Sequence, residues 1–406
     1  MDVDIRKDVV SPWLSPYTLA LGGLALLWVG VSAYVVVTRA LFDLAGLSFH
    51  TARRVLDRRL ARGLSPEAAL SGLPKRTLAG IAADTRTPRP TAEAAARHLL
   101  ARRRGRIVNQ ARSHRSDTDK WRRLAALRIL SLGDSKVARP ELARALRDDD
   151  PDVVGGAVTI LGARTDRTSA TMLVDALREG RYSRSRIAAH LDMFPLEIGD
   201  LLLPLLEDAD GPVRQWAATL LGRYLDPAIE LELATRILDE DPQVRAAVLK
   251  SLTRNRSRLA APAAVTALTD PVWFVRIHAA RALGELGQVE QAPELVALLG
   301  DPKWWVRAAA KESLQELGDG ATSAVLPALK SDDRFVREGA AEVLQNMGVV
   351  DELIRRLELS PHDELALRTL RSIVERGGDA VAGAAAKRAA AAGSTRAAEL
   401  LDSLTR

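Results

Sequence analysis

An arginine that follows a valine returns at a nearly constant spacing in the second half of the chain. Successive spacings are 31, 31, 31 and 30 residues, and the positions are Arg214, Arg245, Arg276, Arg307 and Arg337. The same period extends upstream to Arg122 and downstream to Arg368, which makes about nine units. A period of this length is typical of repeat arrays in which each unit packs only on its neighbours. The repeat therefore decides the predicted fold class.

Each unit is predicted to contain two helices. A shorter apolar stretch comes first, as in residues 292–300, and a turn with Asp-Pro leads into a longer helix that carries the arginine. After the arginine, small apolar residues recur at three and four positions and leucine at seven, for example at Ala279, Ala280 and Leu283. This is one face of a helix with a 3.6-residue period. We expect the aspartate of each Asp-Pro pair to cap the longer helix, at Asp150, Asp241, Asp270 and Asp301.

These units resemble the bacterial HEAT-like repeats, the short-period type also found in phycobilin lyases. The resemblance rests on the pattern D-P-x-x-x-V-R-x-x-A-A-x-x-L-G and covers residues 116–378, about two-thirds of the chain. It implies an all-α fold: a right-handed α-solenoid of about nine helix pairs whose second helices line a concave surface. It also implies a structural ladder between units, formed by the repeated aspartates with Arg214, Arg245, Arg276, Arg307 and Arg337. Val154 and Gly155 depart from the pattern, and we expect an irregular unit there.

An uncharged stretch near the N-terminus predicts a membrane anchor. Residues Tyr17 to Val37 contain no charged side chain over 21 positions. A helix of this length spans about 31 Å, close to the thickness of a bilayer core. Trp13 and Tyr17 at one end and Arg39 at the other are expected at the membrane interfaces. The preceding residues are net negative, unlike the basic start of a cleaved signal peptide.

Charge along the chain sets the expected topology. Residues 1–16 form a short N-terminus, 17–38 a transmembrane helix, and 39–115 a basic juxtamembrane region with 17 Lys/Arg against five Asp/Glu. Positive residues stay in the cytoplasm, so we expect a single-pass protein of the cell (inner or plasma) membrane with the N-terminus outside. The repeats, residues 116–378, are then cytoplasmic. The Ala-rich residues 379–406 are expected to form a capping helix for the array.

Arginines cluster in the basic region, at Arg53, Arg54, Arg58, Arg59, Arg102, Arg103 and Arg104. Three interpretations are open: contact with anionic lipid headgroups, docking on an acidic protein partner, and nucleic-acid binding. No aromatic residues interleave these arginines, which argues against binding of single-stranded nucleic acid. Residues 116–406 contain 39 Lys/Arg against 44 Asp/Glu, which argues against a phosphate-binding groove. We therefore do not expect nucleic acid as the partner.

Aromatic residues are scarce, with 7 Trp, 4 Tyr and 5 Phe, and several stand just before the Val-Arg of successive units. Equivalent positions on stacked helices lie side by side, so we expect a line of aromatic side chains along one edge of the solenoid. Two interpretations are open: packing between units, or a partner groove in which tryptophans anchor the complex. The candidate partner-binding residues are Trp216, Trp273, Phe274, Trp304, Trp305 and Phe335.

No sequence motif for catalysis, for a metal or for a cofactor is found. The chain has no cysteine, and its six histidines lie in different units. We therefore predict no catalytic, cofactor-binding or metal site, and no intrinsic enzyme activity.

The sequence favours a membrane-anchored scaffold or regulatory subunit that binds a protein partner. By analogy alone, the partner is a membrane enzyme or complex, for example a glycosyltransferase or polysaccharide synthase. One alternative is a HEAT-like enzyme of the chromophore-lyase or DNA-glycosylase type. The other is a homo-oligomeric structural membrane protein that self-associates through its spanning helix or its Ala-rich end.

Overall fold

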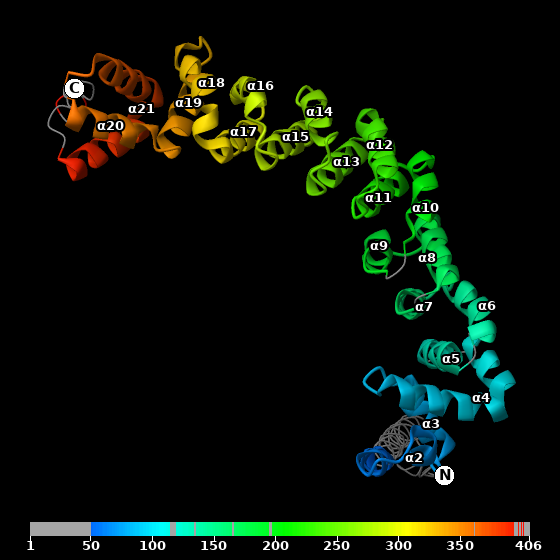
Figure 1. Ribbon diagram of the computed structural model, residues 1–406. Helices are drawn as coiled ribbons and strands as arrows, with labels where there is room; N and C mark the ends of the chain where they lie inside the picture. Colours follow the sequence, from blue (N-terminus) through cyan, green and yellow to red (C-terminus); the bar gives the residue numbers. More distant parts are fainter. Residues whose placement is uncertain are drawn as a thin grey trace, which may run out of the picture. The chain divides into compact units, whose positions relative to one another are not determined.

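The computed structural model describes residues 50–401 except 114–118, 134, 165, 195–196, 361, 394–396, 398 and 400. Every regular element in this part of the chain is an α-helix or a short 3₁₀ helix (Figure 1). The chain divides into two compact parts, residues 1–160 and 161–406, which we call the N-terminal unit and the C-terminal unit. Elsewhere the word unit means one repeat of the array. The predicted all-α fold is confirmed.

The N-terminal unit is a stack of helices. Residues 50–61 are helical, and α2 to α7 follow as Pro66–Leu70, Lys75–Ala83, Arg89–Ala111, Asp119–Gly133, Ser135–Ala145 and Pro151–Gly162, the last of which crosses into the next unit. Helix α4 packs against both α3 and α5. Leu78, Leu127 and Leu142 are at most 1 % exposed and form part of the core. The basic region before residue 116 thus packs on the repeat helices of this unit.

From residue 199 onward, the C-terminal unit repeats a short helix followed by a longer one. Helices α8 to α14 are Arg167–Glu179, Arg184–Asp192, Gly199–Leu202, Gly211–Leu221, Pro227–Thr235, Pro242–Arg254 and Ala260–Ala267. Helices α15 to α21 are Trp273–Glu285, Ala292–Ala297, Trp304–Leu317, Thr322–Val325, Arg334–Asn346, Val349–Leu359 and Glu364–Ala392. Several first helices end in a 3₁₀ turn, as at Leu298–Gly300 and Leu326–Lys330.

The longer helices pack in chain order, which makes this unit a solenoid. Helix α13 packs against α11 and α15, and α17 against α15 and α19 (Figure 1). The expected apolar face is buried: Ala279, Ala280 and Leu283 are all 0 % exposed. A Cβ at Gly284 would lie 2.9 Å from the Cα of Ser313 on the next helix, so α15 and α17 approach closely because this position has no side chain.

Asp241 and Pro242 start α13 as the sequence predicts. The carboxylate of Asp241 accepts a hydrogen bond from the backbone N–H of Gln243 (2.8 Å), and Pro242 is the first helical residue. A proline at this position sacrifices no helical hydrogen bond. Asp150 precedes α7 in the same way and accepts from the N–H of Asp152 at 2.9 Å.

Asp301 does not cap its helix, which corrects the prediction. Helix α17 begins at Trp304 with Lys303 as its N-cap, so Asp301 lies two residues too early. Its carboxylate accepts from the N–H of Lys303 (2.8 Å) and from Arg276 of the preceding unit (2.7 Å). Asp270 stands in the same position before α15 and accepts from the N–H of Val272, the N-cap there. The turn therefore contains two aspartate positions with different functions, two residues apart.

The C-terminal end of the described chain is a long helix. Helix α21 packs against α19 and α20 and runs without interruption through residue 379, where a separate capping helix was expected to start. It ends at Gly393, which adopts a left-handed conformation (φ 71°) that glycine adopts without strain. The remaining predicted domain limits, and the handedness of the solenoid, stay predictions.

The expectation of a single-pass membrane protein is corrected by the structure. Among the described residues, no helix is both long enough and apolar enough to cross a bilayer. The two longest helices, α4 and α21, carry charged side chains along their length, and such charges are costly in hydrocarbon. The segment at 17–38, with Trp13, Tyr17 and Arg39 at its ends, lies outside the described residues. The fold class is therefore an all-α repeat solenoid, and the predicted membrane location is withdrawn.

Candidate functional site

Buried arginine–aspartate pairs connect consecutive units of the solenoid. Nε and Nη2 of Arg245 each donate to one carboxylate oxygen of Asp270, at 2.7 and 2.8 Å. Nη1 of Arg245 donates to the carbonyl of Asp239 in its own unit at 2.7 Å. These hydrogen bonds to Asp270 raise the pKa of the Arg245 guanidinium. A charge-assisted bidentate pair of this kind fixes both the distance and the orientation of neighbouring units. We call each such pair a rung.

Two further rungs have the same geometry. Arg214 donates to the carboxylate of Asp239 at 2.9 and 2.8 Å, and Arg276 donates to Asp301 at 2.7 and 2.9 Å. In each rung the aspartate lies 25 residues after the arginine. These side chains are at most 12 % exposed. The rungs therefore lie largely out of contact with solvent.

In the N-terminal unit a related buried ion pair, which is not bidentate, belongs to Arg123. This residue follows Arg122, to which the sequence period extends. Nη2 of Arg123 donates to Asp148, again 25 residues later, at 3.1 Å, and both side chains are 6 % exposed. The side chain of Arg122 is 66 % exposed and pairs with Asp119 on its own helix. Two adjacent arginines fit the period within its scatter, and only the packing distinguishes them.

The series of rungs ends after Asp301. In each rung the carboxylate belongs to the residue six positions before the next repeat arginine. Asp301, for example, lies six residues before Arg307 and pairs with Arg276. Six residues before Arg337 the chain has Ser331 instead of an aspartate. Nη1 of Arg307 keeps its bonds to backbone carbonyls, at 2.8 Å to Asp301 and 3.5 Å to Pro302. No carboxylate among the described residues lies within ion-pair distance of Arg307.

Five aromatic residues occupy the first turns of three consecutive long helices, and we call them the aromatic edge: Trp273, Phe274, Trp304, Trp305 and Phe335. The exposed fraction is 40 % for Trp273, 53 % for each tryptophan of the Trp304–Trp305 pair, and 51 % for Phe335. Phe274 is half-buried. The edge therefore presents large apolar rings to solvent.

Contacts link the rings of the aromatic edge to one another and to the end of the ladder. The rings of Trp304 and Trp305 stack with centroids 3.6 Å apart, and Trp273 meets Phe274 edge-on at 5.9 Å. The guanidinium carbon of Arg307 lies 4.1 Å from the centroid of the Phe335 ring, in the next unit. This cation–π contact joins α17 to α19.

Trp216, which the sequence grouped with these residues, does not belong to the aromatic edge. It is half-buried and lies after its repeat arginine, not before it.

Two of the predicted basic residues have structural partners. Arg53 pairs with Asp84, and Nη1 of Arg59 donates to the carbonyls of Ala69 (3.0 Å) and Ser71 (2.8 Å). Both arginines thus hold the helix at 50–61 to neighbouring segments. They do not form a free basic surface.

The other predicted basic residues divide between two helices. Arg54 and Arg58 are exposed on the helix at 50–61, and Arg102 and Arg104 are exposed on α4. Arg103 lies between the latter two, at a kink with φ −143° and ψ 20°. Contact of these residues with lipid or with a partner stays a prediction.

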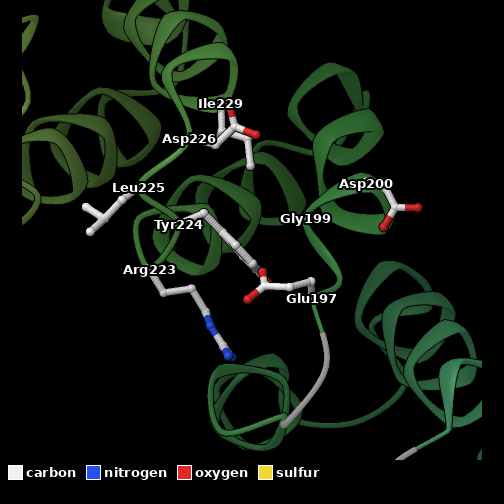
Figure 2. A pocket seen from close by; sticks show the side chains of 8 residues that line it. All are labelled: Glu197, Gly199, Asp200, Arg223, Tyr224, Leu225, Asp226 and Ile229. Carbon is white, nitrogen blue, oxygen red and sulfur yellow. The ribbon is translucent and has the colours of Figure 1, made fainter.

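The described residues also form a pocket of about 610 Å³ that the sequence did not predict (Figure 2). Tyr224 reaches towards Glu197, and its hydroxyl accepts a hydrogen bond from the N–H of Ile198 at 3.2 Å. Burial raises the pKa of Tyr224. Arg223 donates to the carbonyl of Phe194 at 3.0 Å. The pocket is lined by Glu197, Gly199, Asp200, Arg223, Tyr224, Leu225, Asp226 and Ile229. These residues come from two separate segments, one around the start of α10 and one from the end of α11 to α12, and no sequence motif marks them.

The half-buried histidine on α15, His278, is expected to make a pH-dependent contribution to stability. Burial lowers the pKa of His278 to about 4, and the charges of Lys250 and Arg281 act in the same direction. In an unfolded chain the pKa is about 6.5. Between these values the unfolded chain binds a proton that the folded chain does not, so stability is complete above about pH 6.5 and falls as the pH drops towards about 4.

We expect His278→Gln to reduce the acid-induced loss of stability, measured as the difference in Tm between about pH 7.5 and about pH 5. The same replacement at the exposed His362 is the control and should leave that difference unchanged. Equal behaviour of the two variants would contradict the assignment to His278.

Comparisons with known structures find several similar chains. Kap121p bound to the extreme C-terminus of the protein phosphatase Cdc14p is 14% identical with a TM-score of 0.44, over 81% of this chain and 44% of that chain. Kap95p, whose binding induces the switch loops of RanGDP to adopt the GTP-bound conformation, is 15% identical with a TM-score of 0.38, over 81% and 53%. This chain thus spans about half the length of both. Human deoxyhypusine hydroxylase in complex with glycerol is 19% identical with a TM-score of 0.26, over 64% and 99%.

No curated protein matches the sequence. The family of HEAT repeats matches residues 108–191, 199–272, 231–315, 261–345 and 293–365. The match identifies HEAT repeats as a class and does not distinguish the bacterial subtype that the sequence resembles. Because the matched residues cover more than half of the chain, this protein belongs to the HEAT repeat family.

Proposed function

We propose that this protein is a scaffold that binds an extended segment of a protein partner along the aromatic edge. The observation that carries the proposal is the exposure of three large rings, Trp304, Trp305 and Phe335, each more than half exposed on adjacent helices. Isolated exposed apolar side chains need no explanation, but contiguous ones mark interaction surfaces. Tryptophan is the residue most enriched among those that dominate binding energy.

The geometry of the repeats favours an extended partner. Consecutive long helices present equivalent positions at regular intervals, because each unit packs on the next in the same way. The rings of α15, α17 and α19 therefore follow one another along the C-terminal unit. A peptide segment that lies across these helix ends can contact one aromatic position in each unit.

Photo-crosslinking from the aromatic edge tests this function. Trp305 in the full-length chain is replaced by the photoreactive amino acid p-benzoylphenylalanine. The matched control carries the same group at Leu231, which is 58 % exposed and lies on α12, the shorter helix of its repeat. We expect position 305 to give a discrete crosslinked protein that position 231 does not give, identified by mass spectrometry. Identical products from both positions would contradict the proposal.

A further inference from the structure

Where the series of rungs ends, Nε and Nη2 of Arg307 have no carboxylate partner among the described residues. In the three rungs of the C-terminal unit, Nε and Nη2 of the arginine bond both oxygens of an aspartate at 2.7 to 2.9 Å. The same two atoms of Arg307 have no carboxylate within ion-pair distance among the described residues, because Ser331 takes the place of the aspartate. The guanidinium therefore keeps a donor pair that elsewhere in this fold holds a carboxylate.

Ser331 preserves the turn while removing the charge. Its Oγ accepts a hydrogen bond from the N–H of Asp333 at 3.2 Å, as the Asp270 carboxylate does from Val272 at 2.8 Å. The local backbone function of the position is thus maintained. A serine hydroxyl, however, is shorter and uncharged and does not replace the bidentate carboxylate.

Arg307 is held in place without its rung. Two backbone carbonyls accept from its Nη1, and the ring of Phe335 lies against its guanidinium at 4.1 Å. A side chain ordered in advance loses less entropy when it binds a ligand than a free surface arginine does. The donor edge of Arg307 is therefore preorganised, and it lies beside the aromatic edge because Trp304 and Trp305 belong to the same first turn of α17.

The charges around Arg307 determine which ligand fits. Arg337, the next repeat arginine, likewise has no carboxylate within ion-pair distance among the described residues and bonds the carbonyls of Ser331 and Asp332. Lys303 is exposed immediately before Trp304. On the acidic side, Asp333 caps α19 by accepting from the N–H of Phe335 at 2.7 Å, and Asp332 is exposed. Two arginines without carboxylates favour an anionic ligand, and the aspartate geometry of the other rungs indicates a carboxylate.

We propose that Arg307 binds an aspartate or glutamate side chain of the partner segment, which completes the missing rung while apolar residues of that segment contact Trp304, Trp305 and Phe335. The inference rests on the proposed function, namely that the aromatic edge binds a protein segment. It adds the chemistry of the segment: an acidic residue flanked by apolar ones.

The test supplies the missing carboxylate from within the chain. In Ser331→Asp the introduced side chain completes the rung and occupies the donor edge of Arg307. In the matched control Ser331→Asn the side chain has nearly the same shape and no charge. We expect Ser331→Asp to raise the Tm above that of the wild type and of Ser331→Asn, because only the aspartate adds an ion pair between units.

Binding is measured on an array of synthetic dodecapeptides in which each glutamate between apolar residues has a glutamine twin. The full-length wild type should prefer the glutamate peptides by about tenfold or more, the value of a hydrogen bond to a charged group. Ser331→Asp should lose this preference although it folds more stably. A wild type without the preference, or a Ser331→Asp variant that retains it, would overturn the inference.

The same array separates this inference from the proposed function. If replacing Trp304 and Trp305 by alanine abolishes peptide binding while Ser331→Asp changes nothing, the carboxylate site is wrong and the aromatic edge still binds peptide. If the tryptophan variant binds peptides as the wild type does, the proposed function fails as well.

Discussion

Replacing Arg245 with alanine is expected to lower the free energy of unfolding by about 3–5 kcal/mol, the range for removing one partner of a buried ion pair. The reason is the aspartate left behind. The Asp270 side chain is 7 % exposed. Without the guanidinium its charge lies in a poorly solvated site where, among the described residues, the N–H of Val272 remains as its hydrogen-bond donor. Urea unfolding followed by circular dichroism gives the change from the midpoint and the m-value.

A solvent-exposed ion pair between units provides the matched control. Nη2 of Arg281 lies 3.3 Å from Oε2 of Glu312, and the two side chains are 51 % and 58 % exposed. Arg281→Ala should cost less than about 1 kcal/mol, as exposed pairs do. Equal losses in the two variants would show that the rungs are no more important than surface pairs. Because repeat units are coupled mainly through neighbouring interfaces, Arg245→Ala should also reduce the m-value if the array unfolds in parts.

Replacing both Trp304 and Trp305 with alanine is expected to weaken binding of the crosslinked partner by about 100-fold or more. Central tryptophans in interfaces cost roughly 2–4 kcal/mol each when truncated, and the two rings stack on each other at 3.6 Å, so that they present one continuous surface. Each is 53 % exposed in the free protein, and the stability of the fold should therefore change by about 1 kcal/mol or less. Isothermal titration calorimetry with the purified partner measures the affinity.

Trp121 is the control for this prediction. It is 62 % exposed in the N-terminal unit, where the Lys120 ammonium lies 5.3 Å from its ring. Trp121→Ala should leave the affinity unchanged, because this residue is not part of the aromatic edge. Full affinity in the Trp304/Trp305 variant would show that the partner binds elsewhere.

Part of the ladder was predictable from the sequence and part was not. The repeat arginines could be found by counting, and the family resemblance implied that aspartates pair with them. The turn, however, contains aspartate at two positions, and the sequence pattern did not show that Asp241 caps a helix while Asp301 forms a rung. For the same reason the choice between Arg122 and Arg123 required the packing, since a one-residue shift along a helix changes which side chain faces the next unit.

The aromatic residues show a similar division. Their positions before the repeat arginines are visible in the sequence, and two interpretations followed from them, packing between units or a partner surface. The structure shows that Trp304 and Trp305 are each 53 % exposed whereas Trp216 is half-buried. Trp304 and Trp305 lie in the first turn of α17, whereas Trp216 lies further along α11.

The sequence alone predicts an all-α repeat array, because a nearly constant spacing of 30 or 31 residues makes every unit present the same face to the next. It also determined where the arginines and the aromatic residues stand within each unit. Which of these charges has a partner depends on how the units pack. A rung exists when a carboxylate of the next unit reaches the guanidinium, and Ser331 leaves Arg307 without one. The exposure of the aromatic rings also depends on packing. A ring is buried only when the neighbouring unit places atoms against it, and the position of a residue within the repeat does not show whether this happens.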